Sequence, residues 1–160
     1  MPTVYASLRS KANILRAVID ATVRGGDESR PLASDDEWKG MESEVDGREK
    51  LARFARIHRG VCEREAAVFA QLEAAAGAER EAAGMLADHD RRRYETQRRV
   101  ARSLHAARQL RPGLTTRTAA DTIWTLASER TYLALVRDRG WTPARYERWV
   151  TEQLACGLLP

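Results

Sequence analysis

The chain has 160 residues, which is enough for one domain with a sizeable hydrophobic core. Because 43% of the residues are hydrophobic and 31% are charged, the composition excludes a disordered chain. No apolar run approaches the roughly 20 residues that span a bilayer. The net charge of +4 is compatible with a nucleic-acid partner but does not require one. No secretory signal follows Met1, and Cys62 and Cys156 read as reduced thiols, so we expect a cytoplasmic protein without a membrane partner.

The hydrophobic spacing predicts helices along the first half of the chain and no β-sheet. A short helical piece over 2–7 is followed by a helix over about 10–23. A capping box at Ser34 opens a short helix. A second capping signal opens a longer periodic stretch over 46–77, which Gly60 is expected to kink or split.

The second half of the chain is also predicted to be helical. A long helix covers about 78–110 and is followed by a helix over about 115–139 that is apolar over much of its surface. Thr142 caps the last helix, with Pro143 at its first position. A helix that is apolar nearly all round buries more than one partner surface, which favours a subunit interface over a purely internal core.

The N-terminal residues carry a recognisable motif. Tyr5 is followed three residues later by Leu8, then by Lys11, and then by the aliphatic pair Ile14 and Leu15. This spacing resembles the end of the recognition helix and the next helix in the TetR family of transcriptional regulators. Leu8 stands where the family usually has phenylalanine, which is a conservative change at a packing position.

The C-terminal residues resemble an actinobacterial-type branch of the same family. The similar segments are Leu110–Leu114, Ala119–Trp124 and Arg139–Pro143, followed by Tyr146 and Trp149. In that branch a turn with the pattern of Arg139–Pro143 joins the last two helices. The resemblance therefore extends over essentially the whole chain.

The resemblance implies an all-α fold: a TetR-like effector-binding helical bundle preceded by the remnant of a helix-turn-helix domain. It divides the chain into a DNA-binding remnant over 1–24 and an effector-binding and dimerisation domain over 25–160. It assigns DNA contact to Thr3, Tyr5 and Lys11. Family members carry roughly two helices upstream of this point, so we expect operator DNA to be bound only if those helices are supplied.

The function that the resemblance implies is a small-molecule-sensing repressor that forms a homodimer. The alternative is a truncated paralogue that binds ligand, or pairs with a full-length relative, without binding DNA. An enzyme is the third hypothesis, but the sequence has no glycine-rich phosphate loop, no nucleophile elbow and no implied cofactor.

The resemblance places the effector pocket among the central helices and the dimer interface on the last two. Aromatic side chains and a few polar groups are typical of a small-molecule site. The candidate pocket residues are Trp38, Phe54, His58, Cys62, Phe69, Met85, His89, Trp124 and Ser128. The candidate dimer residues are Ile123, Trp124, Ala127, Leu135, Tyr146, Trp149, Val150 and Leu154.

Metal and anion sites are the remaining possibilities. His58 and Cys62 lie four residues apart on one helix face, but spacing supplies no third ligand, so we expect no metal. The neighbouring residues 88–90 point in different directions on a helix and predict a solvated face. The arginines within 91–102 are interleaved with acidic residues and predict an ion-paired, exposed face.

Overall fold

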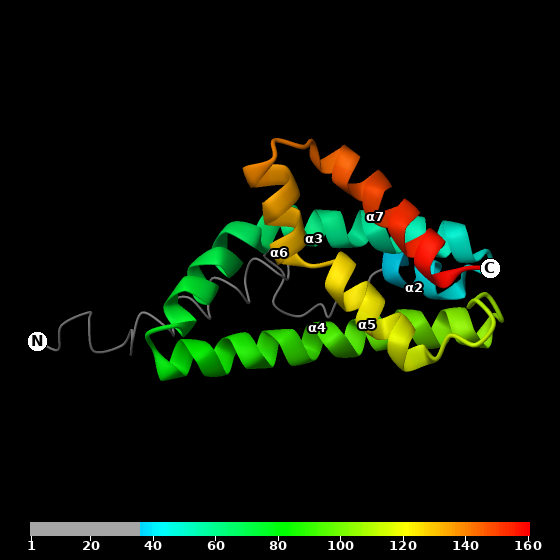
Figure 1. The fold of residues 1–160 in the computed structure, drawn as a ribbon, viewed down its shortest axis with the longest axis horizontal. Helices are drawn as coiled ribbons and strands as arrows, with labels where there is room; N and C mark the ends of the chain where they lie inside the picture. Colours follow the sequence, from blue (N-terminus) through cyan, green and yellow to red (C-terminus); the bar gives the residue numbers. More distant parts are fainter. Residues whose placement is uncertain (1–35) are drawn as a thin grey trace, which may run out of the picture.

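The computed structural model describes residues 36–160, and every regular element in that range is helical (Figure 1). The all-α prediction is therefore confirmed for this part of the chain. The predicted helices over 2–7 and 10–23, and the DNA-contact predictions for Thr3, Tyr5 and Lys11, lie outside the described residues. Among the described helices, none combines the length and apolar character that crossing a membrane requires.

Three helices, α3, α5 and α7, begin where the capping signals predict. The elements are α2 (Asp36–Ser43), α3 (Gly47–Ala76), α4 (Arg80–Ala106), α5 (Thr116–Leu126), α6 (Glu129–Tyr132), the π-helix η3 (Leu133–Asp138) and α7 (Pro143–Leu158). The side chains of Asp46, Thr115 and Thr142 each accept a hydrogen bond from the amide three residues further on, at the starts of α3, α5 and α7. Each of these bonds satisfies a helix amide that would otherwise have no partner.

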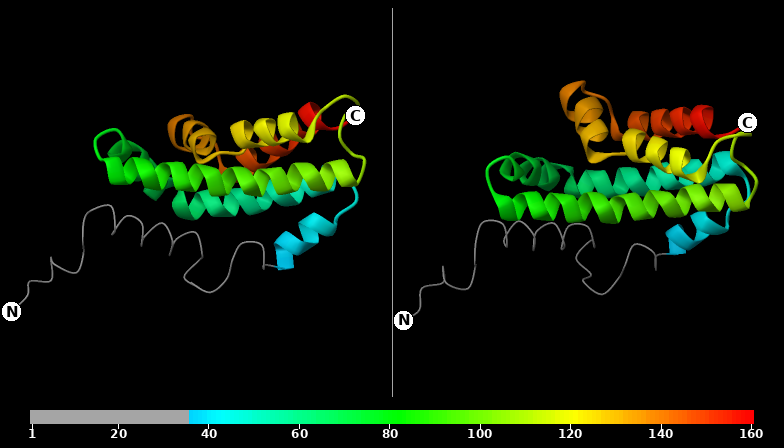
Figure 2. Two further views of the ribbon diagram at one scale, coloured as in Figure 1. Left: turned by 90° about the horizontal axis from the view of Figure 1, so that it is seen from below. Right: turned by 60° about the horizontal axis from the view of Figure 1, so that its bottom comes forward.

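The long helices α3 and α4 run antiparallel and side by side, joined by a short turn (Figures 1 and 2). α5 packs on α4, α7 packs along α3, and α2 covers the beginning of α3. The core lies between these layers and includes the fully buried Leu51, Leu104, Ile123, Tyr146 and Leu154. Each such aliphatic side chain contributes about 1.5–3 kcal/mol through burial, so packing holds the bundle together.

The predictions about helix continuity need correction. α3 continues through Gly60 as one helix, so the stretch is not split there. The predicted helix over 115–139 is broken, because α5 ends at Leu126 and Ala127 has φ −95° and ψ 81°. Ser128 is extended, and its hydroxyl accepts a hydrogen bond from the Thr131 amide at 3.1 Å, so that a new helix begins. This break places Glu129, the first residue of α6, inside the bundle.

Candidate functional site

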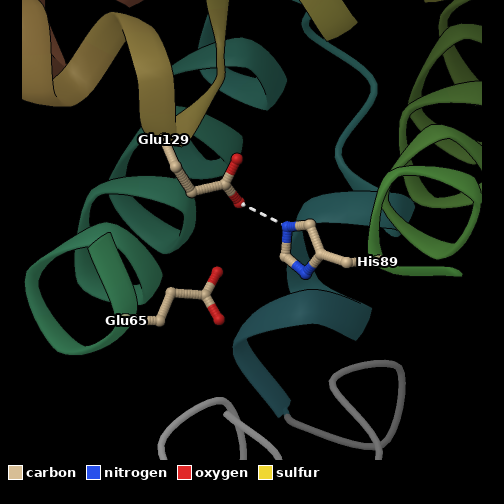
Figure 3. Close-up of side chains that lie close together, drawn as sticks. All are labelled: Glu65, His89 and Glu129. Atoms are coloured by element: carbon tan, nitrogen blue, oxygen red, sulfur yellow. Dashed lines mark ion pairs between the residues drawn. The ribbon is translucent and has the colours of Figure 1, made fainter. Parts of the chain in front are cut away.

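A buried carboxylate, Glu129, lies at the centre of the molecule. The residue is 1% exposed. Its Oε1 is 3.3 Å from Nε2 of His89 on α4 (Figure 3), and its Oε2 is 3.5 Å from Nε of Arg93, one turn further along the same helix. The two carboxylate oxygens therefore face two different partners. The pKa of Glu129 is held well below its usual range: burial opposes its ionisation, but His89 and Arg93 together outweigh that effect.

The guanidinium of Arg93 also closes the end of α5. Its Nη1 donates hydrogen bonds to the carbonyls of Trp124, at 2.9 Å, and Ala127, at 3.0 Å. The guanidinium also lies over the Trp124 ring, 4.6 Å from its centroid. Gln97 adds a bond from Nε2 to the Ala127 carbonyl at 3.3 Å. The last carbonyls of a helix need hydrogen-bond partners when water is excluded. Arg93 and Gln97 supply these partners, which explains why α5 can end inside the bundle.

A second buried carboxyl group, Glu65 on α3, points toward the same space as Glu129 and His89 (Figure 3). One ligand atom from each of these three residues lies within 4.8 Å of the other two. Glu65 is 3% exposed, and its Oε2 has no hydrogen-bond partner among the described residues. Burial, and next the negative charge of Glu129, raise the pKa of Glu65 well above its usual range.

Several other polar atoms of this cluster lack a hydrogen bond of good geometry within the described part of the chain. They are Nε2 of His89, Oδ1 of Asp90, Nε and Nη2 of Arg93, Oε1 of Gln97 and Oε2 of Glu129. Nearly all buried polar groups in proteins are hydrogen-bonded. His89, Asp90, Arg93 Nε and Glu129 are ion-paired with one another, which leaves Oε2 of Glu65, Nη2 of Arg93 and Oε1 of Gln97 without a partner among the described residues. Buried atoms of this kind are typical of a place where a ligand or ion completes the bonding.

A chain of polar contacts extends from this cluster toward α7. His58 Nε2 lies 3.1 Å from the Tyr146 hydroxyl and 3.4 Å from Cys62 Sγ. The Tyr146 hydroxyl donates to the Ser128 carbonyl at 3.4 Å. Burial lowers the pKa of His58 to about 4, against the opposing effect of Glu129, so its imidazole is neutral at physiological pH. Burial also raises the pKa of the Cys62 thiol, which makes it a poor nucleophile.

The cluster is bounded on its other side by Phe69 and Arg130. The Phe69 ring is 5.3 Å from that of His89, and the Arg130 guanidinium lies 5.0 Å from the Phe69 centroid. Arg130 forms ion pairs with Glu73 and Asp90. These contacts fix the His89 ring between an aromatic face and the Glu129 carboxylate.

Most of the predicted pocket residues lie in or beside the polar cluster around Glu129 and its contacts toward Tyr146. They pack against one another there. Trp38 contacts Phe54 edge to face, with 6.5 Å between the ring centroids, and Phe54 stacks on His58. Met85 lies apart, in a smaller apolar cluster with Leu72. A cavity of about 320 Å³ is lined instead by Tyr94, Arg98, Arg102, Thr116 and Arg117, none of them a predicted pocket residue.

The predicted dimer residues need a correction. Ile123, Ala127, Tyr146, Val150 and Leu154 are completely buried within the single chain, so their side chains leave no surface for a second copy. They were expected at an interface because they form apolar stripes, but α3, α5 and α7 bury those stripes against one another. Trp124, Leu135 and Trp149 are partly exposed.

The prediction of an exposed polar face over 88–102 is confirmed only in part. Arg91, Arg98 and Arg99 form partly exposed ion pairs with Asp88, Glu95 and Glu42. His89 and Arg93 point inward instead, with side chains 12% and 8% exposed.

Sequence reasoning also missed Glu65 and Glu129, because an isolated glutamate on a helix usually faces water. The signal that could have revealed Glu129 is the Ser128 cap, which marks a helix start within the apolar stretch.

No family model, no curated protein and no solved structure matches this chain. The functional argument therefore depends on the geometry of the cluster and on the motifs of the sequence.

Proposed function

We propose that the chain is a TetR-like transcriptional regulator whose helical bundle senses a ligand at the cluster of Glu65, His89, Arg93 and Glu129. The observation that carries the proposal is the group of buried polar atoms without a described partner where α3, α4 and α6 meet, namely Oε2 of Glu65, Nη2 of Arg93 and Oε1 of Gln97. A stable core gains nothing from such atoms, because each one costs about 1–3 kcal/mol when it lacks a partner. A binding site explains them, since a bound ligand supplies the missing contacts.

The position of the cluster is suited to a sensor. Its side chains come from three helices that are distant in sequence, and Arg93 joins α4 to the end of α5. A ligand that binds one arrangement of these helices better than another shifts the population toward that arrangement. In the proposed regulator this shift alters DNA binding through residues 1–24, where Tyr5 and Lys11 resemble the phosphate-contacting residues of the family.

The proposal includes repression as the regulatory effect, a cytoplasmic location and a homodimer. The partly exposed Trp124, Leu135 and Trp149 are the candidate contacts between subunits. Aromatic side chains of this kind are enriched at protein interfaces. Analytical ultracentrifugation of the chain is expected to give twice the monomer mass, and a monomer over the whole accessible concentration range would argue against this part of the proposal.

DNA binding is tested by selecting ligands from a random duplex library, both for the purified chain and for a version extended before Met1 by the two upstream helices of the helix-turn-helix domain. We expect the extended version to enrich one operator-like sequence. Lys11→Ala is expected to weaken binding to it at least about tenfold, because the lysine is assigned to a phosphate. Lys39→Ala is the matched control, since Lys39 is an exposed lysine of α2, and it should leave the affinity unchanged. Failure to enrich any sequence, or equal effects of the two substitutions, would contradict DNA recognition by this chain.

A further inference from the structure

We propose that Glu65, His89 and Glu129 form a binding site for a divalent transition-metal ion, with Zn²⁺ as the reference ion. This proposal rests on the ligand site of the proposed function and names the chemical class of the ligand. The three residues come from α3, α4 and α6, and one ligand atom of each lies within 4.8 Å of the other two (Figure 3).

The spacing of the three side chains is close to that of a metal centre. Zinc binds imidazole nitrogen and carboxylate oxygen at about 2.0–2.2 Å, so adjacent ligand atoms in a tetrahedral site lie about 3.3 Å apart. His89 Nε2 and Glu129 Oε1 are already separated by 3.3 Å. The ligand atom of Glu65 lies within 4.8 Å of the other two and has to move closer by up to about 1.5 Å to reach the tetrahedral spacing.

The burial of the carboxylates is the independent observation that points to a cation. Glu65 and Glu129 are 3% and 1% exposed, and Oε2 of Glu65 has no hydrogen-bond partner among the described residues. Two buried carboxylates facing each other are unfavourable unless a proton or a metal cation lies between them, and a metal ion can displace the proton. Arg93 pairs with Oε2 of Glu129, whereas the other oxygen of that carboxylate faces His89.

The type of ligand narrows the choice of ion. One imidazole and two carboxylates suit Zn²⁺, Mn²⁺ or Fe²⁺, whereas Mg²⁺ and Ca²⁺ prefer oxygen ligands alone. With three protein ligands, a fourth position stays open for water or a small anion. The Phe69 ring packs against His89 and holds the imidazole in place. His89 is the most accessible of the three ligands, at 12% exposure, which gives the ion a route from solvent.

A bound ion would join α6 to both long helices. α6 directly follows the break at Ala127 and Ser128, so its position is not fixed by continuous helix hydrogen bonding to α5. An ion held by Glu129, Glu65 and His89 would fix it instead. Metal binding is therefore expected to stabilise the folded chain, by the linkage between binding and folding.

The test is titration of the untagged, chelator-treated chain with ZnCl₂ by isothermal titration calorimetry. We expect one ion per chain and a rise in the thermal unfolding midpoint. Glu65→Gln and His89→Gln should each lower the Zn²⁺ affinity at least about tenfold, since loss of a group that merely orients a metal ligand already costs 10–100-fold. The matched controls are Glu63→Gln, on the exposed side of α3, and His105→Gln, an exposed histidine of α4. Both should bind Zn²⁺ as the unmodified chain does.

Cobalt substitution distinguishes this site from the thiol groups. Co²⁺ bound at the proposed site gives visible d–d absorption without a thiolate-to-cobalt charge-transfer band, because no cysteine belongs to the site. A thiolate band would place the metal at Cys62 or Cys156 and overturn the proposal. Absence of Zn²⁺ uptake, or uptake unaffected by Glu65→Gln, would also overturn it. The Zn²⁺ affinity of Glu65→Gln tests the proposed site even if His89→Gln fails to fold. DNA binding plays no part in these measurements, so the metal site and the proposed function fail independently.

Discussion

Removing the negative charge of Glu129 tests whether it is the counter-charge that allows Arg93 to be buried. Glu129→Gln keeps the size and shape of the side chain. The Arg93 side chain is 8% exposed and its Nε lies 3.5 Å from Glu129 Oε2. Breaking a buried ion pair by removing one partner costs about 3–5 kcal/mol. Arg93 keeps two carbonyl hydrogen bonds and the more distant Asp90 at 3.9 Å, so we expect the lower end, about 3 kcal/mol.

Urea unfolding followed by circular dichroism, in chelator-containing buffer, measures this loss. Glu95→Gln is the control, because Glu95 forms a half-exposed pair with Arg98 at 2.8 Å. Exposed pairs of that kind contribute about 0–1 kcal/mol. Arg93→Met alone and combined with Glu129→Gln completes a double-mutant cycle, which should give a coupling energy of about 1–3 kcal/mol. If Glu129→Gln costs no more than Glu95→Gln, or if the cycle shows no coupling, Glu129 is not what compensates the charge of Arg93.

Three further predictions concern stability. Because the pKa of His58 is about 4 in the folded chain and about 6.5 when unfolded, the unfolded chain takes up the proton first as the pH falls from 6.5 to 4, and stability is lost over that range. His58→Gln should therefore remove about 2 kcal/mol of the stability difference between pH 7 and pH 4.5 in urea titrations, and an unchanged difference would show that His58 is not protected from protonation. Gly60→Ala should stabilise the chain by about 0.5–1 kcal/mol, measured by thermal unfolding, because an added Cβ meets only the Arg64 side chain at 3.6 Å inside α3. Gly47→Ala should instead destabilise it by about 1–3 kcal/mol in the same measurement, because its Cβ would come within 2.9 Å of Leu159; equal effects of the two glycine substitutions would refute the packing argument.

The local signals in the sequence were sufficient to locate the starts of α3, α5 and α7. Asp46, Thr115 and Thr142 cap helices because a cap depends on residues within one turn of it. The break after Leu126 was not predicted, since the apolar pattern continues across it without a glycine or proline. It is stabilised by Arg93, which is more than thirty residues away in the sequence and whose contacts no local pattern reveals.

The same limit applies to the candidate site. Four residues were selected from the sequence for their chemical type, and they do lie in or beside the polar cluster: His58, Cys62, Phe69 and His89. Glu65 and Glu129 were not selected, because their burial depends on how α3 and α6 meet rather than on spacing within either helix.

The hydrogen bonds from Arg93 to the end of α5 limit how the helices of the bundle can move. Helices held only by apolar side chains tolerate lengthwise sliding, because one aliphatic contact can replace another. The Arg93 guanidinium holds two specific carbonyls, those of Trp124 and Ala127, and a slide of one helical turn, about 5.4 Å, would break both bonds. We therefore expect α5 to pivot about this point instead of sliding along α4. Because the bonds hold the last turn of α5, such a pivot leaves that end nearly in place and displaces the opposite end, at Thr116, the most. A small rotation of the helix close to Glu129 would therefore become a larger movement at the start of α5.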